Sequence, residues 1–348
     1  MPNKQYLNEI TYLRPVIVFL IVVNHSFAVY SGVWNSPWGD SAPNIPLYVW
    51  IQRFAISCTL QVFTFVSGYV YEFQLKKKTE ETLSALINNK SQRLLIPYVV
   101  FSVVYYIVCV PFGLFSLLGF FHELFYGMGH LWFLLMLFWV FVVHKLLCNI
   151  LSRCKYQQYI LLFISLLFTY LPSFIPQILG LKSFFAYYFY FVLGTFILKR
   201  VNLHTKSYSS IRKGLVFFAL FVSFWLIYYW MIGNGNMHLS KVLIGIITKS
   251  VHIVMCVTGI VSILCVTRWL SNNYQPSKLV KYLSSCSFGI YIFHQTILQF
   301  LYYRTGCITQ MGGGKILLPW MGLVISYFLS ILLTVLLKKT EFGRAILK

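Results

Sequence analysis

The sequence predicts an all-α membrane protein, a polytopic bundle of about ten transmembrane helices with both termini in the cytoplasm. Of its 348 residues, 59% are hydrophobic and only 10% are charged, whereas a soluble domain carries roughly 25% charged residues. Apolar segments of about 20 residues, the length that crosses the hydrocarbon core as a helix, recur along the chain. Both observations indicate a multi-pass protein in a lipid bilayer.

Short connections join the expected spans. No soluble domain stands between them, so we expect one integral-membrane domain over residues 1–348. The spans are expected at 12–31, 47–73, 94–114, 130–148, 157–176, 183–199, 214–232, 249–269, 282–302 and 317–337.

The basic residues orient these helices. The chain has 28 Lys and Arg against seven acidic residues, a formal net charge of +21. Most of the basic residues fall at the two ends of the chain and in alternate connections, whereas the other connections hold only Lys182, Lys241, Arg304 and Lys315. Because positive residues stay on the cytoplasmic side, both termini are predicted there. The charge therefore indicates orientation, and we expect no nucleic-acid partner.

Cysteine spacing predicts neither a disulfide framework nor a metal site. The chain has eight cysteines, none of them in a C-x-x-C pair, and most lie within expected spans. A thiol in such a position behaves as a small apolar group. No metal cofactor is expected.

Two ionisable residues flank the apolar part of the first span, in YLRPVIVFLIVVNHSF at 12–27. Pro15 is tolerated in the first turn of a helix, so the helix is expected to begin near Arg14 at the cytoplasmic boundary. Arg14 and His25 are then about 16 Å apart on nearly the same face. His25 would lie about half way across the membrane, where an ionisable residue indicates a functional site. The structural alternative is that Arg14 anchors the helix and His25 bonds a neighbouring helix.

This pair suits a long, thin, phosphorylated ligand. A guanidinium binds phosphate bidentately, and an imidazole serves as a base toward a hydroxyl. Acyl-coenzyme A has a nucleotide head, a pantetheine arm and a terminal thioester, so it would span the distance. These residues predict acyl transfer to a hydroxyl.

Five motifs in order resemble the acyltransferase-3 family of integral-membrane acyltransferases, which acylate cell-surface glycans. The resemblance covers nearly the whole chain, and each motif alone is weak. The motifs are the Arg14-to-His25 spacing, FTFVSGYV at 63–70, KSQRLLIPY at 90–98, GHLWFL at 129–134 and SFGIYIFHQ at 287–295.

The resemblance assigns roles to four residues. His25 matches the catalytic histidine and Arg14 its partner arginine, while Lys90 and Arg93 match a basic pair that would bind coenzyme A phosphates. The family often has an acidic residue three positions before the arginine, but Thr11 stands here. We consider Glu9 a possible substitute for it.

Five further residues are candidates for substrate binding, each with a structural alternative. Arg53 in the second span would line an acceptor cavity or extend to the outer interface. His130 and Trp132 stand at the outer start of the fourth span, where aromatic residues also anchor helices. Tyr291 and His294 lie three residues apart in the ninth span, and either helix packing or chemistry accounts for them.

The resulting hypothesis is an acetyl-coenzyme A-dependent O-acetyltransferase in a bacterial cytoplasmic (inner) membrane. It would transfer an acyl group, most simply acetyl, from cytoplasmic acyl-coenzyme A to a hydroxyl of an extracytoplasmic or lipid-linked sugar. His25 would act as general base, or would itself be acylated. The alternatives are a transporter or flippase of a sugar or lipid-linked sugar and an inactive membrane subunit. A transporter usually needs buried carboxylates, and the seven acidic residues are not clearly central in the spans.

Overall fold

The computed structural model describes residues 7–75, 81–110, 115–172, 175–200, 210–233 and 240–347. Residues 111–114 and 173–174, which belong to two expected spans, lie outside these ranges. In the described ranges the chain is helical, without a strand, so the all-α fold class is confirmed. The helices are α1 (Asn8–Ser26), α2 (Pro46–Ile56), α3 (Thr59–Leu75), α4 (Leu83–Lys90), η1 (Ser91–Leu95), α5 (Ile96–Cys109), α6 (Leu117–Tyr126), η3 (Gly129–Leu131), α7 (Trp132–Ile150), α8 (Gln157–Phe168), α9 (Leu181–Arg200), α10 (Ile211–Gly233), α11 (Lys241–Asn273), α12 (Lys278–Tyr303), α13 (Gly314–Lys339) and α14 (Glu341–Ile346).

Eight helical segments of the described chain are long and apolar enough to cross a membrane. They correspond to eight of the ten expected spans, which supports a multi-pass membrane protein. The expected span at 157–176 contains α8, which has only 12 residues. The expected span at 282–302 lies in α12, which has 26 residues but carries several polar side chains. The number of spans therefore stays a prediction.

The first helix differs from its expected limits. Helix α1 begins at Asn8, well before Arg14, and contains Pro15 in its interior. Because proline has no amide N–H, the helix lacks the backbone hydrogen bond from residue 15 to the Thr11 carbonyl. The helix ends at Ser26, because the amides of Phe27 and Ala28 bond the carbonyls of Val23 and His25 in a closing turn. His25 therefore lies in the last turn of the helix.

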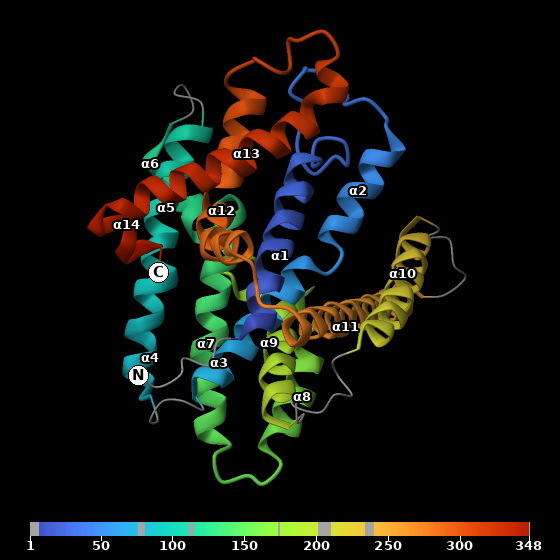
Figure 1. Ribbon diagram of the computed structural model, residues 1–348, viewed down its shortest axis with the longest axis vertical. Helices are drawn as coiled ribbons and strands as arrows, with labels where there is room; N and C mark the ends of the chain where they lie inside the picture. Colours follow the sequence, from blue (N-terminus) through green and yellow to red (C-terminus); the bar gives the residue numbers. More distant parts are fainter. Residues whose placement is uncertain are drawn as a thin grey trace.

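Helix α1 lies in the middle of the bundle, where it contacts α12, α11, α2, α13 and α3 (Figure 1). Helices α1 and α12 are parallel. Asn8 at the start of α1 bonds Gln275, just before α12, and His25 at the end of α1 contacts His294. Burial of Ser287, His294 and Gln295 against protein explains why α12 is less apolar than a lipid-exposed helix.

Glycines allow α3 and α9 to pack in close contact. Gly68 faces the Phe191 backbone and Gly194 faces the Phe65 backbone, and a Cβ added at either glycine would overlap the facing carbonyl oxygen. Small residues at membrane helix interfaces allow this close approach. Both glycines are thus required by packing.

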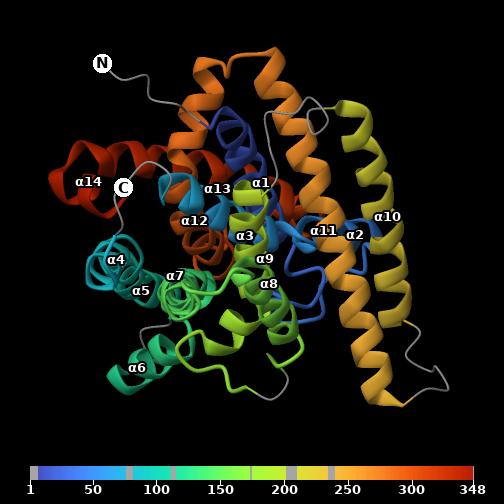
Figure 2. The ribbon, with the colours of Figure 1, turned by 90° about the horizontal axis from the view of Figure 1, so that it is seen from below.

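Helices α10 and α11 lie side by side at one edge of the bundle (Figure 2). Most of α10 faces outward, with apolar side chains such as Val216 and Trp230 about 60% exposed. An apolar exposed helix of 23 residues is typical of a lipid-facing span. Helix α11 contacts α1 and α10, so it lies between α1 and this lipid-facing helix.

Candidate active site

Two histidines from parallel helices meet about three turns beyond Arg14. His25 lies in the last turn of α1, and His294 lies past the middle of α12. The Nε2 atom of His294 lies 3.0 Å from the Nδ1 atom of His25. His294 is fully buried, and His25 is partly exposed. The two ring centroids are 5.0 Å apart. Sequence proximity does not predict this pair, because 269 residues separate its members.

Backbone carbonyls determine which ring nitrogens carry protons in the neutral histidines. The Nδ1 atom of His294 lies 2.9 Å from the Ile290 carbonyl, which only accepts, so this nitrogen donates and the Nε2 atom accepts. The Nδ1 atom of His25 lies 3.1 Å from the Ile21 carbonyl and must also donate. Its proton is therefore shared with the Nε2 atom of His294. The Nε2 atom of His25 is left with a free lone pair, as a general base requires.

His130 and Tyr291 extend this pair into a cluster. The His130 ring centroid is 4.8 Å from that of His294 and 6.3 Å from that of His25. Tyr291 donates to the His130 carbonyl at 2.5 Å, and the His130 Nε2 atom donates to the Ile292 carbonyl at 3.0 Å. The Nδ1 atom of His130 is buried and has no hydrogen-bond partner in the described residues. Three of the predicted residues, His130, Tyr291 and His294, therefore form one cluster with His25.

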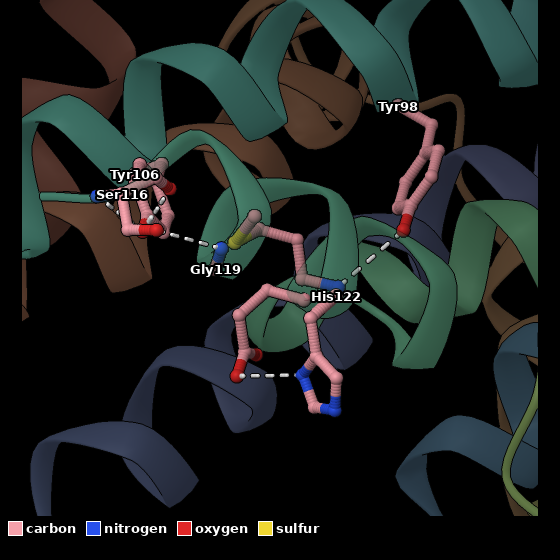
Figure 3. A network of polar contacts seen from close by, with 7 residues as sticks. Tyr98, Tyr106, Ser116, Gly119 and His122 are labelled. Atoms are coloured by element: carbon pink, nitrogen blue, oxygen red, sulfur yellow. Dashed lines mark hydrogen bonds and ion pairs between the residues drawn. The ribbon is translucent and has the colours of Figure 1, made fainter.

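Hydrogen bonds to Tyr98 hold the segment before α7 (Figure 3). The Tyr98 hydroxyl donates to the Leu124 carbonyl at 2.6 Å and accepts from the Met128 amide at 3.4 Å. Gly129, directly before His130, has φ +47°, a conformation that glycine adopts easily. These contacts direct the His130 ring toward α12.

A central cavity of about 300 Å³ connects the basic residues with this cluster. Arg14, Lys90 and Arg93 all line it, and so does Tyr291. The Tyr291 ring centroid is 6.2 Å from that of His294. The cavity therefore runs from the predicted phosphate-binding residues to a side chain that contacts the histidine cluster. His25 itself does not line it.

Lys90 and Arg93 reach this cavity from a π-helical segment. Segment η1 separates α4 from α5 and carries Arg93, and Lys90 is the residue before it. A π-helical turn changes the rotation between successive side chains and often marks a functional site. The ammonium of Lys90 lies 3.6 Å from the Phe141 ring centroid, a cation–π contact that holds it at the cavity wall.

Glu9 does not substitute for the missing acidic partner of Arg14. Its carboxylate accepts a hydrogen bond of 2.9 Å from Tyr69, which itself accepts one of 3.1 Å from Arg268. In the described chain, no ion pair forms with Arg14. The reason is geometric, since residues 9 and 14 are five apart and project from different faces of α1.

Arg53 and Trp132 contact aromatic residues rather than the histidine cluster. The Arg53 guanidinium lies over the rings of Trp50 and Tyr229, 5.2 and 5.0 Å from their centroids. The Trp132 ring lies 5.8 Å from that of Tyr187. Neither residue has a described contact with the histidine cluster, and their substrate-binding roles stay predictions.

The structure adds residues to this site that sequence reasoning missed. Trp34 stacks on His25 with ring centroids 5.7 Å apart and an interplanar angle of 28°. Gln52 donates a buried hydrogen bond of 2.7 Å to Asn24, the residue before His25. Asn24 within an apolar run is the only sequence signal for this contact. Trp34 lies in a connection rich in Trp, Pro and Gly, where nothing distinguishes it from its neighbours.

Comparison with known families gives one match over most of the chain. The family model described as an acyltransferase domain, of the acyltransferase-3 type, matches residues 7–339. The chain belongs to the acyltransferase-3 family. No curated protein and no solved structure matches it.

Membership of the acyltransferase-3 family identifies the protein as a membrane acyltransferase. The match includes both parallel helices, α1 and α12, and the basic segment η1. Within the described ranges, no group of three or more His, Cys, Asp or Glu side chains is arranged to hold a metal ion.

Proposed function

We propose that this acyltransferase moves an acyl group, most simply acetyl, from cytoplasmic acyl-coenzyme A to a hydroxyl of an extracytoplasmic or lipid-linked glycan. The observation that carries the proposal is the hydrogen-bonded His25–His294 pair, which leaves the Nε2 atom of His25 free to accept a proton. The cavity between Arg14 and Tyr291 supports a donor whose phosphates bind at one end and whose thioester reaches the other.

Each residue has a defined part in the proposed reaction. Arg14, Lys90 and Arg93 bind phosphate oxygens of the donor through charge-assisted hydrogen bonds. The acceptor oxygen attacks the thioester carbon as its proton passes to the Nε2 atom of His25. The carbon–sulfur bond then breaks, and the thiolate takes the proton from His25 and leaves as coenzyme A. The products are the glycan ester and the free thiol, and His25 returns to its neutral form.

His294 acts as a positioning residue in this proposal. By accepting the Nδ1 proton of His25, it fixes the His25 tautomer that presents a bare Nε2 atom. The same principle operates in hydrolases whose histidine is oriented by a second side chain. Trp34 on the other side of the His25 ring limits its rotation.

Mass spectrometry of surface glycans tests this function. We expect glycans from cells that carry the gene to include species heavier by one acyl group, and glycans from cells without it to lack them. Expression of the wild-type protein should restore these species, whereas His25→Asn should not. Identical glycan masses in all strains, with the protein present in membranes, would contradict the proposal.

A further inference from the structure

A second, polar cavity of about 650 Å³ adjoins the central cavity at its Arg14 end. Its lining side chains come from α1, from the first turns of α12 and from Gln275 between α11 and α12, and all are polar. Arg14, Ser284 and Ser285 line both cavities. A ligand that extends through both would therefore pass Arg14.

The charge of this polar cavity favours an anion. Arg14 and Lys281 line it, and none of the described carboxylates does. A third cation is close, because the Lys338 ammonium donates to the Ser285 carbonyl at 2.7 Å. Hydroxyls of Ser284 and Ser285 add groups that bond phosphate or ribose oxygens.

The alternative position for a nucleotide, on the Lys90 side of the central cavity, is less suitable. The cavity there measures about 90 Å³, much less than the polar cavity. Glu81 also lines it together with Lys90 and Arg93. A carboxylate at that place repels a phosphate. Size and charge therefore both favour the Lys281 side.

We propose that the polar cavity binds the 3′-phosphorylated adenosine diphosphate head of the donor, an inference that rests on the proposed function. Lys281 binds the 3′-phosphate, and Arg14 binds the diphosphate where the two cavities meet. Lys90 and Arg93, which line the central cavity together with Arg14, bind the same diphosphate from that cavity. The pantetheine arm continues along the central cavity. The parallel helices provide the path. Arg14 to His25 and Ser284 to His294 each span about 15–16 Å of helix, so the arm runs between two walls that end at the histidine pair.

Donor analogues test this site in purified protein. Lys281→Ala is expected to raise the KM for acetyl-coenzyme A roughly tenfold, since a hydrogen bond to a charged group contributes about 1.5 kcal/mol or more. It should leave the KM for acetyl-3′-dephospho-coenzyme A and for acetyl-pantetheine within about twofold of wild type. Lys281→Arg should restore the KM for acetyl-coenzyme A. The matched control is Lys278→Ala, one turn earlier on α12 and outside the cavity lining, which should change none of these values.

The outcomes separate this inference from the function on which it rests. Wild-type protein that transfers no acetyl group from any donor would contradict the proposed function. Active wild-type protein in which Lys281→Ala changes the KM of all three donors equally, or of none, would overturn only the nucleotide site. An anionic lipid headgroup is the other source of phosphate. An effect of Lys281→Ala that occurs in phosphatidylglycerol vesicles and disappears in phosphatidylcholine vesicles would also overturn the nucleotide site.

Discussion

His294 accepts the Nδ1 proton of His25 across 3.0 Å, and this contact joins the last turn of α1 to the C-terminal half of the parallel helix α12. The Ile290 carbonyl, 2.9 Å from the Nδ1 atom of His294, prevents that nitrogen from accepting in the neutral ring. A chain of donors thus runs from His25 through His294 to the backbone of α12. This chain, with the basic cavity at Arg14, is the basis of the predictions below.

Replacement of His25 by asparagine should abolish most of the transfer. The asparagine amide nitrogen occupies roughly the place of Nδ1 and still donates to the Ile21 carbonyl, but no base remains at the position of Nε2. Since general-base catalysis contributes about 10²–10⁴-fold, we expect kcat to fall at least 100-fold. The measurement is thiol release from acetyl-coenzyme A in the presence of acceptor. A variant that inserts normally, has an unchanged Tm and keeps more than a tenth of the rate would contradict the role of His25.

Two substitutions of His294 separate orientation from packing. His294→Gln is expected to retain a side-chain oxygen that accepts from His25, whereas His294→Phe keeps ring volume and loses the acceptor. We expect kcat to fall about 100-fold in His294→Phe, because without the orienting acceptor His25 also adopts the tautomer whose Nε2 atom is protonated. The fall should be distinctly smaller in His294→Gln. The donor KM should stay nearly unchanged in both variants. Steady-state kinetics on both variants provides the comparison. Equal losses in both would indicate a purely structural role.

Removal of the Arg14 guanidinium should weaken donor binding. Hydrogen bonds to charged groups contribute about 1.5–3 kcal/mol, so Arg14→Ala is expected to raise the KM for acetyl-coenzyme A about 10- to 100-fold. Arg14→Lys should recover part of this loss, because a lysine provides the charge without bidentate geometry. The control is Lys315→Ala, which removes a cation paired with Asp40 at 3.1 Å and should leave the donor KM unchanged. An unaltered KM in Arg14→Ala would exclude its phosphate-binding role.

Alanine at Gly68 should destabilise the protein without changing the site. The added Cβ would overlap the Phe191 carbonyl and separate α3 from α9, and such overpacking costs about 1–3 kcal/mol. The Tm in detergent should therefore fall by several degrees. Gly245→Ala is the matched control, since Gly245 also lies in a helix but has no atom within 4 Å of an added Cβ. There the Tm should stay equal or rise, because alanine favours helix over glycine. A Gly68→Ala protein as stable as wild type would show that α3 and α9 separate at little cost.

Several features of this protein follow from local sequence. Hydropathy predicts helical spans because each span must satisfy its own backbone in lipid, and eight of the ten expected spans coincide with long apolar helices. Ordered motifs led to the acyltransferase-3 family, which the match over residues 7–339 confirms. The limits of α1 were predicted less well, because Pro15 is accommodated inside the helix and the chain closes the helix at Ser26.

Contacts between helices that are far apart in the sequence depend on how the helices pack, and local sequence patterns do not predict them. Arg14, Lys90 and Arg93 were predicted together as phosphate-binding residues, but their position around one cavity depends on how α1 and η1 pack. Likewise, His294 and Tyr291 were substrate-binding candidates within the ninth expected span, without a predicted contact to His25. No sequence pattern distinguished Trp34 or Lys281 from their neighbours. Hydropathy and charge are properties of neighbouring residues and determine spans and orientation. The tautomer of His25 depends on the Nε2 atom of His294, which is 269 residues away in the sequence. Only the packing of α12 against α1 brings these two side chains together.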